Sequence, residues 1–523
     1  MSILAIQPLV QLRDEFRLSM RRLWQELCRE LQGDYSDLAS QFRLPADFFQ
    51  VLGQSLKPES YSSGTIVGWI ETLNDLVYFL DLLRQWDRER QRQEFAEQLF
   101  ADCEEKFFEH GYLDEIFPSG RPEVAGLEQR LVRLCERLSQ DLNQDSLLFD
   151  PAVTVKWCRL HSIRGWNVPG SLNANFERAE ESGRLSVGVS GDACSAPSIM
   201  RRELKRSAGR AMFRVERTGI VLKLGRVESD VWVGWGGKGE WRWKLSPAAV
   251  ALETSRGPLT VGSTLVYGKN RQPRTVVRTA LGQVDRIAQA WRVIQQAWPE
   301  GHEVLALLTS RIIPLKAKGV VSFSYRHRPG FSFINCFDRD NLDLIDDLIH
   351  ENSHHHLNLL LRKYVMYHGD HNQQIFYSPW RRSLRPMRGI LHATFTFTMG
   401  AMLFERLSAW GMKGKKSGGK RPRLIRLTGR ELLRARFRCL EEVESVRYSL
   451  QDLHYADHHL GWLTGSGRRL VGQLAEAIEQ VERRIASRRN EVLRSKFGPS
   501  LRRHIEELKS ARMTYGPIRL SRT

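Results

Sequence analysis

The sequence predicts a predominantly helical α+β fold in which a small β-sheet precedes a helix rich in histidine. Apolar residues recur every three or four positions over most of the chain, which indicates amphipathic helices. Between residues 211 and 268 the period changes to two, which indicates strands. A chain of 523 residues with 41% hydrophobic and 27% charged residues can bury about two or three independent cores.

Residues 1–150 form the first predicted region. Leu12, Phe16, Met20 and Leu23 fall on one face of a helix, and similar patterns follow them. No motif with recognisable chemistry occurs in this region. We therefore expect a helical N-terminal domain and assign it, as a hypothesis, to recognition of the substrate.

Residues 151–300 form a predicted mixed α/β region. Ile220, Leu222 and Leu224 alternate with other residues, and the glycines of "GWGGKGEW" mark turns, so we expect hairpin strands. A helix should follow, because apolar side chains return to helical spacing before residue 300.

Residues 301–412 form the predicted metal-binding catalytic core. Three strand-like runs come first, at residues 304–313, 320–325 and 331–337. A helical pattern begins after Asp340 and resumes beyond a polar loop. This order places the histidine-rich segment on a helix that leaves a small sheet.

Residues 413–523 begin with a basic linker rich in glycine and lysine and continue as charged helices. The run from Lys413 to Arg438 holds eleven Lys or Arg residues and the single acid Glu431. The whole chain has a formal net charge of +19 and a pI of about 9.8. Such a charge predicts attraction to an anionic partner, which could be a nucleic acid, a membrane surface or an acidic polypeptide.

The cysteines and the apolar segments indicate a cytoplasmic protein. The seven cysteines are scattered without a C-x-x-C pair, which is typical of reduced thiols. The N-terminus lacks the features of a signal peptide. The most apolar window, residues 64–83, contains Glu71, Asp75 and Asp81, so we expect a core helix there and no membrane partner.

His350, Glu351 and His354 occupy the pattern H-E-x-x-H. On a helix, residues four apart lie about 6 Å apart along the axis on nearly the same face, so both imidazoles can reach one ion. Catalytic metals of this type usually take three protein ligands, so a third must come from elsewhere. The metzincin pattern is excluded, because Leu357 and Leu360 stand where it needs Gly and His.

The third ligand has several candidates downstream. His392 is preferred, because it lies in a predicted apolar helix where an imidazole needs a partner. Glu405 on the same helix is the alternative. His368, Asp370 and His371 lie in a polar loop, where His368 and Asp370 also form the H-x-D pattern of jelly-roll iron oxygenases. That fold would need about eight strands around the motif, and the following segments are helical.

Four arginines lie between the motif and His392 in the sequence: Arg381, Arg382, Arg385 and Arg388. The planar guanidinium suits a bidentate carboxylate or phosphate. A hydrolytic zinc site does not require such a cluster, whereas a site that holds a dicarboxylate cosubstrate does. Ion pairs with nearby surface acids are the other explanation.

Three stretches resemble a known family: "VVSFSYRHRPGFSFIN", "LIHENSHHHLNLL" and "FYSPWRRSLRPMRGILHATF". They are similar to the HExxH-motif peptide-modification proteins of ribosomal peptide natural product pathways. The resemblance implies a metallopeptidase-like HExxH helix used for oxygen chemistry, in an Fe(II)- and 2-oxoglutarate-dependent peptide β-hydroxylase. It implies His350, His354 and His392 as iron ligands and an arginine among Arg381, Arg385 and Arg388 on the cosubstrate.

Two other functions stay open. A zinc metallopeptidase would use the same ligands, with Glu351 as the general base. In the oxygenase Glu351 would instead orient neighbouring groups. A nucleic-acid-binding protein with a structural metal is the third hypothesis, and no recognisable nucleic-acid-binding motif accompanies the basic run. For the oxygenase, we expect the partner to be a precursor peptide whose acidic leader the positive charge would attract.

Overall fold

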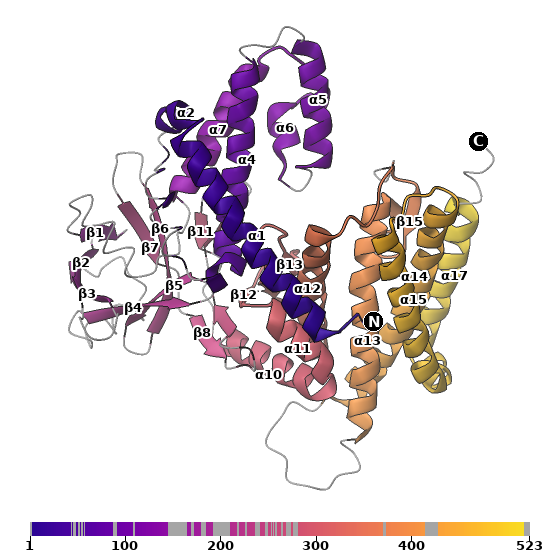
Figure 1. The fold of residues 1–523 in the computed structure, drawn as a ribbon. Helices are drawn as coiled ribbons and strands as arrows, with labels where there is room; N and C mark the ends of the chain where they lie inside the picture. The colour runs from indigo at the N-terminus through magenta and orange to yellow at the C-terminus, as the bar shows by residue number, and fades with distance from the viewer. Residues whose placement is uncertain are drawn as a thin grey trace. The chain divides into compact units, whose positions relative to one another are not determined.

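The fold is predominantly helical with a small mixed sheet, as the sequence predicts (Figure 1). The computed structural model describes residues 3–144 with short gaps, the strands between residues 165 and 275, and residues 281–369, 373–413 and 427–516. Two compact units are present: unit 1 comprises residues 1–16, 250–262 and 277–523, and unit 2 comprises residues 17–249 and 263–276. Among the described residues, no helix is long and apolar enough to cross a membrane.

These units divide the chain differently from the predicted boundaries at residues 150, 300 and 412. One hydrophobic core runs from the strand β9 (Leu259–Gly262) to the C-terminal helix α17 (Gly498–Tyr515). It includes Leu348, Phe395 and Leu440, which lie on three different helices. The helices beyond residue 412 therefore share the core of the histidine-rich segment.

Unit 2 combines helices with a β-barrel. Its helices are the later part of α1 (Ile6–Gln32), then α2 (Ser36–Gln41), η1 (Pro58–Ser62), α4 (Gly64–Trp86), α5 (Arg92–Glu105), α6 (Tyr112–Ile116) and α7 (Leu127–Gln144). Trp24 and Trp69 stack in its core at a centroid distance of 5.0 Å. The apolar window of residues 64–83 is the core helix α4, as predicted.

The predicted hairpin strands belong to a closed barrel. Its strands are β1 (Gly165–Val168), β2 (Leu172–Arg178), β3 (Leu185–Gly191), β4 (Arg210–Glu216), β5 (Gly219–Leu224), β6 (Val227–Trp235) and β7 (Trp241–Leu245). Successive strands pair antiparallel, and β1 closes the ring by pairing parallel with β7. A two-stranded sheet, β10 (Leu265–Tyr267) with β11 (Pro273–Thr275), completes unit 2.

The sheet of unit 1 has five strands in the order β13-β14-β12-β9-β8. Beside β9 they are β8 (Ala249–Leu252), β12 (Arg311–Leu315), β13 (Phe323–Ser324) and β14 (Phe331–Asn335). β12 pairs parallel with β9 and β14, and β13 pairs antiparallel with β14 at one edge. The short β13 therefore has only one neighbouring strand within this sheet.

The predicted strand over residues 304–313 is wrong in its first half. Helix α11 (Pro299–Leu308) covers it, and β12 begins only at Arg311. The helix starts with proline in its first turn, where the missing N–H is harmless. Period alone cannot separate a short buried helix from a buried strand when both are uniformly apolar.

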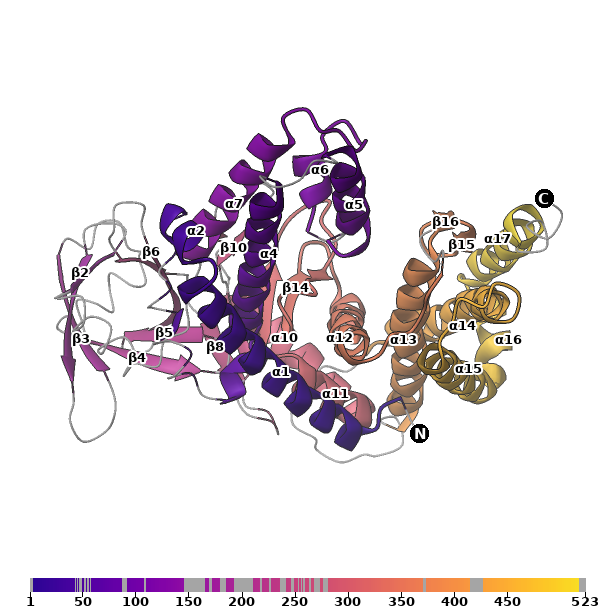
Figure 2. The same cartoon turned by 45° about the horizontal axis from the view of Figure 1, so that its top comes forward.

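The remaining helices of unit 1 stack in layers. They are α10 (Leu281–Ala297), α12 (Asn341–Lys363), α13 (Met387–Lys413), α14 (Gly429–His458), α15 (Gly465–Ile485), η3 (Ala486–Arg488), α16 (Arg489–Leu493) and α17. Helix α13 lies between α12 on one side and α14 with α15 on the other (Figure 2). A hairpin, β15 (Phe376–Ser378) and β16 (Ser383–Arg385), leads into α13.

Candidate metal centre

Helix α12 carries the H-E-x-x-H motif and is fixed at its start and along its buried side. Asp340 caps its N-terminus in a capping box with Asp343. The Asn352 amide donates to Thr309 Oγ1 at 3.0 Å, and the His355 ring contacts the backbone of Gly330. These hydrogen bonds fix the rotation of α12 about its own axis, so the side chains of the motif point in defined directions.

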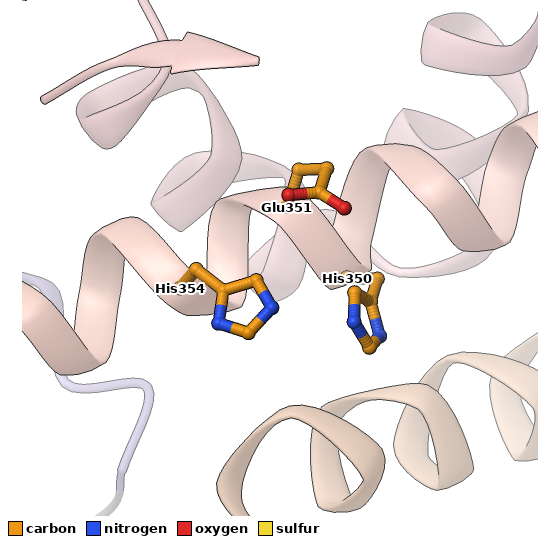
Figure 3. Close-up of side chains that lie close together, drawn as sticks. All are labelled: His350, Glu351 and His354. Atoms are coloured by element: carbon orange, nitrogen blue, oxygen red, sulfur yellow. The ribbon is translucent and has the colours of Figure 1, made fainter. Parts of the chain in front are cut away.

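The three residues of the motif lie close together. One ligand atom from each of His350, Glu351 and His354 can be chosen so that all lie within 4.8 Å of one another. Figure 3 shows the two imidazoles on one side of α12 and the carboxyl of Glu351 on another. The imidazole centroids are 5.0 Å apart, with the ring planes 81° apart.

His392 of α13 lies next to this pair. Its ring centroid is 6.3 Å from that of His354. Two imidazoles on one ion, with bonds of roughly 2.0–2.1 Å, have centroids at most about 6.5 Å apart. A separation of 6.3 Å is near this maximum, so His354 and His392 could share an ion only from nearly opposite sides of it.

The three imidazoles are held in the form that binds metals. Burial lowers the pKa of His350 and lowers that of His354 further, where the neighbouring His350 and His392 add to the effect. Burial lowers the pKa of His392 to about 4, helped by the positive charges of Arg326 and Arg388. Neutral imidazole is the ligand form, so no proton must leave at neutral pH before a metal binds.

Glu405, the alternative third ligand, faces another helix. Its carboxylate lies 3.7 Å from Arg484 of α15 and 3.6 Å from Arg406. The group of described residues whose ligand atoms lie within 4.8 Å of one another includes neither Glu405 nor His392. Its partners explain why a buried carboxylate is tolerated at this position.

Of the three loop candidates for the third ligand, the structure describes only His368. His368 is exposed, and its backbone N–H donates to Trp462 O at 2.9 Å. Asp370 and His371 lie outside the described residues. The segment that follows them is the hairpin and then α13, so the eight strands expected around an H-x-D motif do not occur there.

Glu351 is buried, with 2% of its surface exposed. Its pKa is raised to about 8, mainly by burial and also by the charges of Asp347 and Asp346, and the nearby Ser324 hydroxyl opposes the shift. Its Oε2 atom has no hydrogen-bond partner among the described residues. A buried carboxyl oxygen without a partner, beside two imidazoles, fits a group that interacts with a bound metal or its ligand.

The arginine cluster divides into paired and unpaired members. Arg382 lies 3.1 Å from Glu507 of α17, which is the ion pair that the alternative explanation expects. Arg381 and Arg385 have exposed side chains with no acid within 4.0 Å among the described residues. The charge of Arg381 lowers the pKa of His350, and that of Arg388 lowers the pKa of His392.

Several residues near the site are not identified by the sequence patterns. Arg326 lies close enough to His392 to lower its pKa. It belongs to the "YRHRPG" turn, and the basic residues of this turn are the sequence feature that could have pointed to it. Arg438 and Glu442 also approach the site, from α14, and no local pattern could have connected them with it.

The cluster of His350, Glu351 and His354 could hold a divalent metal, and the neutral imidazole of His392 lies near His354. No protein-family model matches this sequence, and no curated protein is similar to it.

Proposed function

We propose that this protein is a non-haem Fe(II)- and 2-oxoglutarate-dependent dioxygenase that hydroxylates the β-carbon of a residue in a ribosomally made peptide. The observation that carries the proposal is that Arg381 and Arg388 lie near enough to the histidines to lower the pKa values of His350 and His392. Zinc hydrolysis needs no such cluster, whereas a cosubstrate with two carboxylates does.

The residues of the site have separate roles in this proposal. His350, His354 and His392 hold the metal through neutral imidazoles. Arg388, with Arg381 or Arg385, binds the distal carboxylate of 2-oxoglutarate. Bound iron would supply the oxygen chemistry, in which one atom of O2 enters succinate, the other enters the product hydroxyl, and CO2 is released.

A peptide suits the surface next to the motif. Among the described strands, none pairs with the outer edge of β13. Val321 and Tyr325 beside this edge are 64% and 37% exposed. Ser324 on β13 faces Glu351. An extended peptide that adds to this edge would gain backbone hydrogen bonds and pass beside the metal site.

A zinc metallopeptidase is the second candidate, because one specific observation favours it. The buried Glu351 carboxyl, with its raised pKa of about 8 and one oxygen without a partner, has the features of a general base. As a base it would take a proton from a metal-bound water.

The nucleic-acid hypothesis loses part of its support. Arg434, Arg436 and Arg438, from the basic run that ends at residue 438, each pair with carboxylates inside unit 1. Their charge is used within the fold, so it contributes little to a surface that could bind phosphates.

Mass spectrometry of reacted peptides separates the two enzymes. Protein purified without air is supplied with Fe(II), 2-oxoglutarate, O2 and a mixture of peptides, and we expect an intact peptide that gains the mass of one oxygen atom, together with succinate. Cleaved peptides formed with zinc and without 2-oxoglutarate would establish the peptidase instead. Glu351→Gln should abolish cleavage in a peptidase and only reduce hydroxylation in the oxygenase.

A further inference from the structure

A closed ring of contacts joins the metal site to helix α14. The ring of His350 lies edge-on to Phe397 of α13 at a centroid distance of 5.2 Å. Phe397 stacks on Trp380 of the hairpin loop, with centroids 4.2 Å apart and planes 5° apart. The Trp380 indole N–H donates to Glu442 of α14 at 2.8 Å.

Arg438 closes this ring. Its guanidinium donates to Glu442, one turn later on α14, at 3.2 Å. The same nitrogen donates to Asp346 of α12 at 3.2 Å. Asp346 lies four residues before His350, so it occupies the same face of α12 one turn earlier.

The charged side chains in this closed ring of contacts are mostly buried. The side chain of Glu442 is 3% exposed, and those of Asp346 and Arg438 are 18% and 30% exposed. The guanidinium of Arg438 also lies over the ring of Phe404 on α13, at 5.2 Å. A guanidinium that bonds two carboxylates through one nitrogen and also covers an aromatic ring has little freedom to move.

We infer that Arg438 is a positioning residue for the metal site, which it serves by fixing Asp346 ahead of His350 and, through Glu442, the ring of Trp380 against Phe397. The inference rests on the proposed metal site. Trp380 immediately precedes Arg381, so the same contacts fix the start of the arginine turn. Supporting groups of this kind commonly change metal affinity by about 10- to 100-fold when they are removed.

Arg434 provides a matched control. It lies one turn before Arg438 on α14, it is exposed to a similar degree (28% against 30%), and it also pairs with aspartates at the start of α12, with Asp343 at 3.0 Å and with the N-cap Asp340 at 2.6 Å. Arg434→Gln therefore breaks a bridge between the same two helices, but at a position two turns from His350.

The test is the affinity of the full-length protein for Co(II), followed by the visible absorption of the bound ion, for wild type, Arg438→Gln and Arg434→Gln. We expect Arg438→Gln to weaken Co(II) binding about tenfold or more and to change the absorption spectrum. Arg434→Gln should bind as wild type does, and both variants should show comparable losses in melting temperature.

Two results would overturn the inference: normal Co(II) binding by Arg438→Gln, or an equal loss in Arg434→Gln, which would indicate general loosening of the helices. If Arg438→Gln does not fold, Trp380→Phe decides, because it retains an aromatic ring beside Phe397 and removes the N–H that donates to Glu442. Normal binding by that variant also counts against the inference. Wild type that binds Co(II) no better than His354→Ala would refute the metal site itself, which is a distinguishable outcome.

Discussion

His350 and His354 are four positions apart on one helix, whereas His392 comes near His354 only because α13 packs beside α12. The first two could be recognised from spacing alone. The third depends on a tertiary contact, and its choice over Glu405 depends on which face of α13 turns toward α12. Glu405 faces Arg484 of α15 instead.

Replacing the histidines one at a time tests this assignment. We expect His350→Ala, His354→Ala and His392→Ala each to reduce bound metal to background, because each removes one of three ligands. Metal content per protein after anaerobic loading with Fe(II) measures the effect, and circular dichroism checks the fold. Glu405→Ala should keep its metal, with some loss of stability because Arg484 loses its partner. Metal loss in Glu405→Ala with retention in His392→Ala would transfer the third ligand to the carboxylate.

Buried histidines away from the metal should make the fold sensitive to acid. His302 of α11 is buried with its ring edge-on to Trp291, and burial lowers its pKa below the ordinary 6.5. Burial also lowers the pKa values of His355 and His356 to about 4. Below about pH 6.5 the unfolded chain binds these protons and the folded chain does not, so the free energy of unfolding falls with falling pH.

The variant His302→Phe isolates one of these groups, because its ring can keep the edge contact with Trp291. Between about pH 7.5 and about pH 5.5 we expect the metal-free variant to lose less stability than wild type, with about 1.4 kcal/mol per pH unit as the upper limit for one histidine. Urea denaturation at both pH values measures the difference. The exposed His454→Gln is the control and should follow wild type. Identical pH dependence in His302→Phe and wild type would contradict the prediction.

At the scale of whole elements, the helices α14 and α17 pack against the hairpin of β15 and β16, which carries Arg381, Arg382 and Arg385. Tyr377 of β15 stacks on Tyr515 of α17 at 5.4 Å and contacts Tyr448 of α14 edge-on at 6.0 Å. The exposed pair between Arg382 and Glu507 adds little by itself, because water screens it. The aromatic contacts are therefore the firmer support for the hairpin.

Removing the ring of Tyr377 should affect the cosubstrate more than the metal. We expect Tyr377→Ser to weaken 2-oxoglutarate binding roughly 3- to 10-fold, because one or two aromatic contacts, each worth about 0.5–1.5 kcal/mol, no longer hold the arginines. Fe(II) affinity should change much less. The visible absorption of the anaerobic Fe(II) and 2-oxoglutarate complex measures both. Tyr377→Phe keeps the rings and should behave as wild type. Equal losses of affinity for Fe(II) and for 2-oxoglutarate would show that the hairpin does not act on the cosubstrate alone.

At the scale of the whole molecule, the first sixteen residues belong to unit 1 although the rest of the predicted N-terminal domain does not. Leu9 packs against Val304 and Leu307 of α11, and Glu15 pairs with Lys363 at the end of α12 at 3.0 Å. A deletion of residues 1–150 would therefore damage the unit that carries the metal site. A test of substrate recognition by this region must keep residues 1–16.

The net charge of +19 predicts that the protein attracts an acidic segment of the peptide partner. Because Arg434, Arg436 and Arg438 are paired inside unit 1, we expect the lysines of the linker to attract an acidic leader. Of these, Lys415, Lys416 and Lys420 lie outside the described residues, and Lys413 ends α13.

Changing these four lysines to Gln should weaken binding of an acidic peptide severalfold at low salt and have little effect at high salt, since screening acts over about 8–10 Å. Fluorescence anisotropy of a labelled Glu-rich peptide measures the affinity. The four Lys→Arg changes keep the charge and should leave binding unchanged. Normal peptide binding by the Gln variant, with lost affinity for DNA, would instead assign the linker to nucleic acid.

The sequence by itself determined the features that depend on local spacing. It predicted the predominantly helical α+β class, the helix that carries His350 and His354, and the core helix α4, because helical period, caps and spacing act within a few residues. Tertiary structure decided everything that joins distant segments. Closure of the barrel, the helix over residues 299–308, and the approach of Arg438 to Asp346 across 92 positions depend on packing, which residues close in sequence do not encode. The proposed three-histidine site combines both kinds of feature: two of its proposed ligands lie on one helix, and the third, His392, lies on the helix that packs against it.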